Sequence, residues 1–154
     1  QRHGHSTPAM AEEDSEPFEP QEGKGAFLLP DGSKYDGDWI IVDGVRQRHG
    51  HGLYIDGIVK GQSYQGEWQN DKMHGRGVFR YASGAKYEGD FVDNVYSGSG
   101  KYTFPDGAFY EGSFAQGQMH GTGTLTDTQG VVWEGKFYMG TGPGLPATAT
   151  TTTP

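Results

Sequence analysis

An alternating pattern of aromatic rings, glycine and acidic residues recurs along most of the chain. Its clearest copy is the pentapeptide Tyr87-Glu88-Gly89-Asp90-Phe91, in which two rings and a glycine alternate with two acids. Successive side chains of a β-strand point to opposite faces of a sheet. The pattern therefore predicts a strand with one aromatic face and one acidic face.

Copies of this strand follow at a fixed interval. They begin at Tyr64, Tyr87, Tyr110 and Trp133, each 23 residues after the one before, and a fifth copy begins at Tyr35, 29 residues ahead of Tyr64. A repeat of this length indicates an array in which each unit contacts mainly its neighbours.

Return strands marked by Gly-x-Gly lie between the aromatic strands, as in Gly75-Arg76-Gly77 ahead of Tyr87. Turn signals such as Ser83-Gly84 and Pro105-Asp106-Gly107 lead into the next aromatic strand and supply glycine where φ must be positive. The sequence predicts an all-β fold, a single-layer twisted antiparallel sheet of about five hairpins and about ten strands, with essentially no helix.

The faces of neighbouring strands predict a register. If Tyr81 opposes Tyr87, then Phe79 opposes Gly89 and Gly77 opposes Phe91, so that each ring covers a glycine on the neighbouring strand. The same register can be written for every unit. A ring over a glycine shields backbone in a sheet that no helix covers.

The first unit differs from the others by extra residues, which we place in its loops. They add Arg46, Arg48, His49, His51 and Lys60 to an otherwise nearly neutral array. Loop variation on a rigid repeat is a common site of recognition. Arg46, Arg48, His49 and Lys60 are therefore a candidate basic recognition loop, although a merely solvated loop explains them as well.

Composition divides the chain into three parts: a disordered acidic arm (1–22), the repeat array (23–138) and a flexible Thr-rich tail (139–154). The net charge of −8 is concentrated in the arm, and only 32% of the residues are hydrophobic. The nearly neutral repeats lack the basic stripe that nucleic acid selects. With no cysteines there is no disulfide framework, and no apolar run is long enough for a spanning helix.

The repeated sequence resembles the MORN repeat. The stretch from Tyr64 to Gly77, Tyr-Gln-Gly-Glu-Trp-Gln-Asn-Asp-Lys-Met-His-Gly-Arg-Gly, is similar to that pattern at almost every position. The chain departs from it at Ser97, where His is usual, and at Ser113, where an acid is usual. The resemblance implies a twisted β-rod with an aromatic groove and a scaffolding role at cilia, cytoskeleton or membrane-associated sites.

We expect a non-catalytic scaffold whose groove takes a helix or an extended segment of a partner protein, because rigid aromatic rings dominate interface energetics. The expected setting is cytoplasmic, in a ciliary, axonemal or other cytoskeletal assembly. The rings are equally consistent with a purely structural role. The candidate groove residues are Tyr35, Trp39, Tyr64, Trp68, Tyr87, Phe91, Tyr110, Phe114, Trp133 and Phe137.

Two alternatives stay open: a peripheral module that binds acidic phospholipids, and a regulatory fragment of a larger enzyme. No catalytic, cofactor or metal site is expected. His49, His74 and His120 occupy equivalent positions of successive units, so a rod holds them at separate steps, whereas a catalytic set needs convergent partners.

Overall fold

The computed structural model describes residues 3–5 and 21–145. Most of the predicted arm and the end of the predicted tail lie outside these ranges. The ten strands are β1 (Glu22–Leu28), β2 (Lys34–Val42), β3 (Val45–Ile55), β4 (Ser63–Gln69), β5 (Lys72–Arg80), β6 (Lys86–Val92), β7 (Val95–Thr103), β8 (Phe109–Ala115), β9 (Gln118–Thr126) and β10 (Val132–Phe137).

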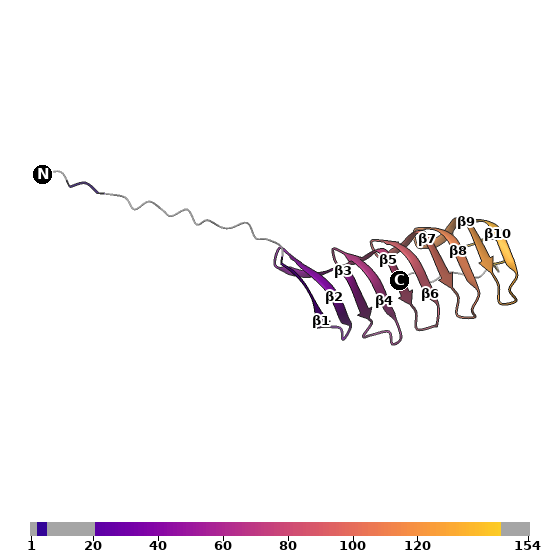
Figure 1. Cartoon of the computed structure of the whole chain (residues 1–154), viewed down its shortest axis with the longest axis horizontal. Helices are drawn as coiled ribbons and strands as arrows, with labels where there is room; N and C mark the ends of the chain where they lie inside the picture. The colour runs from indigo at the N-terminus through magenta and orange to yellow at the C-terminus, as the bar shows by residue number, and fades with distance from the viewer. Residues whose placement is uncertain (1–2, 6–20, 146–154) are drawn as a thin grey trace.

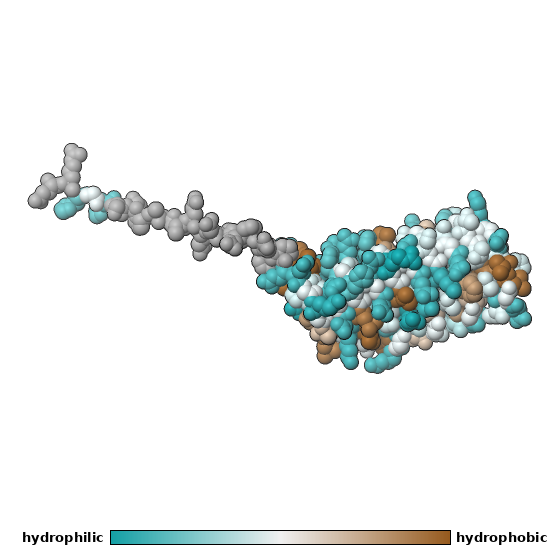
Figure 2. Space-filling view, in the orientation of Figure 1, coloured by the Kyte–Doolittle hydropathy of each residue, from teal (hydrophilic) through white to brown (hydrophobic). Residues whose placement is uncertain are grey.

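All ten strands form one open sheet in chain order, and every neighbouring pair is antiparallel. Figure 1 shows them following one another along the sheet from β1 to β10. No helix occurs within the described ranges. The predicted all-β, single-layer sheet of five hairpins is confirmed. The face seen in Figure 2 is a mixture of hydrophilic residues and residues of intermediate hydropathy, with smaller hydrophobic patches.

Two-residue turns lead from each aromatic strand into the next return strand. Asn70 and Asp71 in one turn, and Asp93 and Asn94 in the next, have φ between 46° and 71°. Asn and Asp tolerate this left-handed region better than most residues do, because their short polar side chains bond locally. The sequence therefore specifies where each tight hairpin closes.

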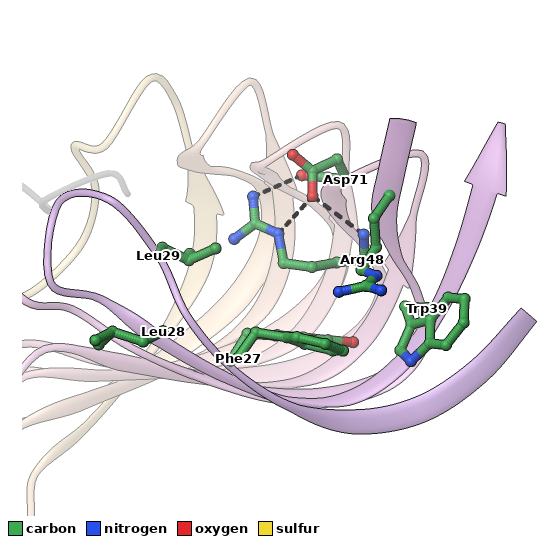
Figure 3. A pocket seen from close by; sticks show the side chains of 8 residues that line it. Phe27, Leu28, Leu29, Trp39, Arg48 and Asp71 are labelled. Atoms are coloured by element: carbon green, nitrogen blue, oxygen red, sulfur yellow. Dashed lines mark hydrogen bonds and ion pairs between the residues drawn. The ribbon is translucent and has the colours of Figure 1, made fainter. Parts of the chain in front are cut away.

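A β-bulge recurs in the aromatic strands β2, β4, β6 and β8, at a position that holds an acid in the first three. The register shifts between Gly66 and Trp68 and again between Gly89 and Phe91, so the residue between them has no direct partner. Asp90 instead accepts a hydrogen bond from the backbone N–H of Ser99 at 3.1 Å. A bulge increases local twist and bends the strand, and its repetition produces the curved sheet seen in Figure 3.

The predicted register is wrong by two residues. Phe79 opposes Tyr87, Gly77 opposes Gly89 and Gly75 opposes Phe91. Tyr81 pairs instead within the connecting loop, where its N–H donates to the carbonyl of Ala85 at 2.9 Å. The same shift holds in every unit, so glycine faces glycine across the strands.

Rings nevertheless cover glycines, as predicted, but on a different strand. The ring of Tyr87 lies over Gly100 of β7, and that of Tyr64 lies over Gly77 of β5, with atoms close enough that a Cβ at either glycine would collide with them. Each ring therefore reaches diagonally to the strand that follows its own. Glycine is required there because the ring occupies the space of a side chain.

The prediction that both insertions of the first unit lie in loops is half wrong. The turn between β2 and β3 is as short as the others, so its four extra residues lengthen the two strands. Arg46 and Arg48 consequently lie in strand β3. The second insertion does lie in a loop, between Ile55 and Ser63, and Lys60 belongs to it.

Candidate functional site

One face of the sheet, here called the aromatic face, carries a continuous row of rings. Tyr64 packs edge-on against Phe91 at 5.1 Å, Tyr87 against Phe114 at 5.0 Å, and Tyr110 against Phe137 at 4.7 Å between ring centroids. Within a unit the same edge-on contact joins Tyr87 to Phe91 at 5.1 Å. The row is therefore a packed core that links one unit to the next.

Burial separates the ten candidate groove residues into two groups. Seven of them between Tyr64 and Phe137, together with Tyr35, are at most 5% exposed: Tyr35, Tyr64, Trp68, Tyr87, Phe91, Tyr110, Phe114 and Phe137. The other two, Trp39 near the first hairpin turn and Trp133 in β10, are half-buried and 43% exposed, respectively. Only these two present substantial ring surface.

The tyrosine hydroxyls explain why the buried rings are tyrosine. Each donates to the carbonyl three residues ahead at the bulge, as Tyr64 does to Glu67 at 2.7 Å and Tyr87 does to Asp90 at 2.8 Å. The bulge carbonyl thereby gains a partner. Burial raises the pKa of Tyr35 to about 12 and also raises the pKa of Tyr64 above its usual value.

A pocket of about 290 Å³ opens on the aromatic face at its β1 end. In Figure 3, Phe27 and Trp39 lie along the curved sheet, with the paired Arg48 and Asp71 side chains above them. We call this the N-terminal pocket. Its lining residues are Phe27, Leu28, Leu29, Tyr35, Trp39, Arg46, Arg48 and Asp71.

Arg48 occupies a position that is apolar in the other units. It opposes Trp39, as Met73 opposes Trp68 and Tyr96 opposes Phe91. Its guanidinium lies 4.3 Å from the Trp68 ring centroid, and its Nε donates to Asp71 at 2.7 Å. The first unit thus places a paired cation where its neighbours bury a methionine or a tyrosine.

Arg46 extends this feature toward the edge of the sheet. Its guanidinium lies 4.3 Å from the Phe27 ring centroid and 4.7 Å from that of Trp39. The residue is exposed. Within residues 3–5 and 21–145, no carboxylate forms an ion pair with it. A guanidinium on aromatic rings with an open side suits a carboxylate ligand.

The predicted basic loop is not one surface. Arg46 and Arg48 share the aromatic face. Lys60 lies beyond the opposite end of β3. His49 alternates with Arg48 and so belongs to the other face of the sheet.

The other end of the aromatic face is covered by the chain itself. After β10 the chain turns back: Gly142 lies against the Phe137 ring, and Gly144 lies against the Trp133 indole without room for a Cβ. A Cβ on Gly135 would stand 3.0 Å from Pro143. Leu145 packs against the core. The sequence pattern ends at Phe137, so only the apolar Leu145 could have signalled this contact.

The histidines stand at separate steps, as predicted. His74 Nδ1 lies 3.7 Å from Asp93, and His120 Nδ1 accepts a hydrogen bond from the Met139 N–H at 3.3 Å. Each contacts the turn of the next unit. Among the described residues no cluster of His, Asp or Glu is placed to hold a metal ion. That part of the chain also has no helix with the length and apolar character to cross a membrane.

Comparison with known proteins agrees with the repeated geometry. The family model described as MORN repeat matches residues 47–57, 64–86, 87–109 and 110–132. A comparison with curated proteins found no match to the chain. The matched segments cover more than half of the 154 residues and follow the steps of the sheet from β3 to the start of β10. The chain belongs to the MORN repeat family, with four repeats over residues 47–132.

Proposed function

We propose that this protein is a non-catalytic scaffold that binds a helical or extended segment of a partner protein at the N-terminal pocket. The observation that carries the proposal is the half-buried pair Phe27 and Trp39 beside the guanidinium of Arg46, which has no ion pair within the described part of the chain. Exposed aromatic rings and arginine are the side chains that most often supply binding energy at interfaces.

The rest of the aromatic face supports this location. Between β4 and β8 the rings are packed against one another, and at β10 the segment Gly142 to Leu145 covers Phe137 and part of Trp133. A partner segment therefore finds contact area chiefly at the β1 end. The pocket also lies next to the edge of the sheet, since β1 contributes to its lining and is the first strand in the order of the described sheet.

The cellular setting of the proposal comes from the resemblance. The stretch from Thr126 to Gly135 is similar to small proteins built only of MORN repeats, of the type called MORN repeat-containing protein 2. On that basis the proposed setting is the cytoplasm, in a ciliary, axonemal or other cytoskeletal assembly.

Site-specific photo-crosslinking tests the pocket. A photoreactive phenylalanine analogue replaces Phe27 in the full chain, and a matched variant carries it in place of Tyr138, which is 71% exposed near the other end. We expect a discrete protein adduct from position 27 only, lost when Trp39→Ala is added. Trp39→Ala must keep the melting temperature of the parent, which a thermal scan checks.

Two outcomes contradict the proposal. Equal adducts from both positions would mean that the pocket has no special role. Strong, salt-sensitive co-sedimentation of the full chain with vesicles containing phosphatidylserine, lost on Arg46→Gln, would favour a phospholipid-binding module instead.

A further inference from the structure

We propose that the chain's own acidic segment, residues 12–19, docks in the N-terminal pocket with a carboxylate on Arg46. The segment reads Glu-Glu-Asp-Ser-Glu-Pro-Phe-Glu. Docking itself does not depend on the proposed function. Its consequence, competition with a partner segment for the same pocket, does rest on it.

Gln21, the described residue nearest to this segment in sequence, lies close to the pocket. The carbonyl of Gln21 accepts a hydrogen bond from the Ile41 N–H at 2.6 Å, and Ile41 opposes Arg46 on the next strand. Two strand spacings separate Gln21 from the Arg46 backbone, about 10 Å. At about 3.5 Å per residue, Glu19 and Glu16 are within reach of the guanidinium.

The ladder between β1 and β2 offers the segment little further pairing. Strand β2 ends at Val42, one residue beyond the Ile41 that bonds to Gln21. Pro17 and Pro20 both lack an N–H, so residues 17–20 are poorly suited to a regular strand. Residues 12–19 would then cross the aromatic face rather than extend the sheet.

Charge and shape agree between the segment and the pocket. Arg46 has no ion pair among the described residues, whereas the Arg48 guanidinium is already engaged by Asp71. Carboxylates of Glu16 or Glu19 suit the planar donors of Arg46. Phe18 lies between them in sequence and supplies a ring for the half-buried rings of the pocket.

At the opposite end of the molecule, a segment outside the sheet also packs on the aromatic face. There a segment that follows the last strand turns back over the aromatic face, and Gly144 and Leu145 contact Trp133 and the core. At the β1 end the corresponding rings are Phe27 and Trp39. The inferred docking would cover the rings at the β1 end, as residues 142–145 cover rings at the β10 end.

Zero-length crosslinking in the full chain tests the docking. Carbodiimide joins a carboxylate directly to an amine, so Arg46→Lys places a reactive amine in the pocket while keeping the charge. Lys24 is the internal control: it lies three residues from Gln21, but it alternates with Gly23 and Gly25 and so points to the other face, where it pairs with Asp38 at 3.5 Å.

We expect intramolecular crosslinks from Glu16 or Glu19 to position 46 to exceed those to Lys24 at least fivefold, and to fall at high salt because the pairing is exposed. Equal yields at the two amines would show an undocked tether and would overturn the proposal. Crosslinked dimers carrying the same bond would overturn it as well, in favour of the arm of a second copy.

A second measurement uses the three indole N–H signals of the chain. Glu16→Gln with Glu19→Gln should move the NMR signal of Trp39 and leave that of Trp133 in place, and Arg46→Gln should move Trp39 in the same way. An unmoved Trp39 signal would contradict docking. The absence of a partner adduct at position 27 in the Glu16→Gln, Glu19→Gln variant, whose segment no longer occupies the pocket, would instead count against the proposed function alone.

Discussion

The first hairpin and the central hairpins share one backbone plan but use it differently. In both, a tyrosine covers a glycine of the next strand and donates its hydroxyl to a bulge carbonyl, as Tyr35 does to Asp38 at 2.6 Å. One difference lies in the return strand, at the position that is Arg48 in β3 but Met73 in β5. The longer strands of the first unit add a second cation, Arg46, on the same face. Together these residues leave the aromatic face open and charged where the central units close it.

The largest expected effect is a glycine replacement in a central unit. A Cβ on Gly112 would stand 2.5 Å from the Gly123 Cα and 2.6 Å from the Thr122 carbonyl, both of them backbone atoms that cannot move aside. We expect Gly112→Val to lower the free energy of unfolding by at least about 3 kcal/mol, measured by urea denaturation.

Gly25→Val is the control on the edge strand β1. Its Cβ would meet the edge of the Phe27 ring at 3.3 Å and Nε1 of Trp39 at 3.9 Å, and both rings are half-buried. We expect a loss below about 1 kcal/mol. The position equivalent to Gly112 is Gly37, whose Cβ would collide with the Gly52 Cα, so the contrast is between a central strand and the edge of the sheet. Equal losses for Gly112→Val and Gly25→Val would show that the edge is packed as tightly as the centre and would break the comparison.

The second prediction converts a central unit into a copy of the first. Met73 is 8% exposed, and its backbone N–H donates a hydrogen bond to the Asn94 side chain at 2.9 Å. The Arg48 N–H donates in the same way to the Asp71 side chain at 3.1 Å, so Asn94 is the counterpart of Asp71. Met73→Arg places a cation in this core without a carboxylate. We expect a loss of about 3–5 kcal/mol in urea denaturation.

Adding Asn94→Asp should recover a large part of that loss, because it restores the carboxylate at the position of Asp71. Asn94 has φ of 71° and Asp71 has φ of 67°, so the turn accepts either residue. A double variant no more stable than Met73→Arg alone would show that the ion pair of the first hairpin depends on its longer strands and the pocket beside them, and not on this pair of positions.

The fold was predictable because its signal is local and repeated. Alternation within Tyr87 to Phe91 identifies the strand faces, and the 23-residue interval identifies the array. The register was not predictable from the same pattern. A shift of two residues keeps every side chain on its face, so alternation could not choose between Tyr81 and Phe79 as the partner of Tyr87. The loop hydrogen bonds decided it.

The candidate site was predictable only as a set of rings. Which rings are buried depends on contacts between units, such as that of Tyr64 with Phe91, and on sheet curvature. Neither is visible in one unit. The pairing of Arg48 with Asp71 did leave a signal, since aligning the units places Arg48 against Met73 and Asp71 against Asn94.

The smallest expected effect concerns a feature that the first and central hairpins share and the fourth lacks. Asp38 and Asp90 accept hydrogen bonds from backbone N–H groups at their bulges, at 2.9 Å and 3.1 Å, whereas the equivalent residue of β8 is Ser113. We expect Ser113→Asp to raise the free energy of unfolding by about 1 kcal/mol by giving the Thr122 N–H a charged acceptor.

The bond from His51 lowers the pKa of Asp38. An aspartate at position 113 should behave likewise, so its gain should be present above the pKa of an unfolded aspartate and disappear as the pH falls through the lowered folded value. Ser113→Asn, which offers a neutral acceptor of the same shape, should give a smaller gain that does not change between pH 2 and pH 6. If thermal scans show equal gains for the two variants at every pH, the acid of the repeat acts by shape alone, and its charge does not distinguish one hairpin from another.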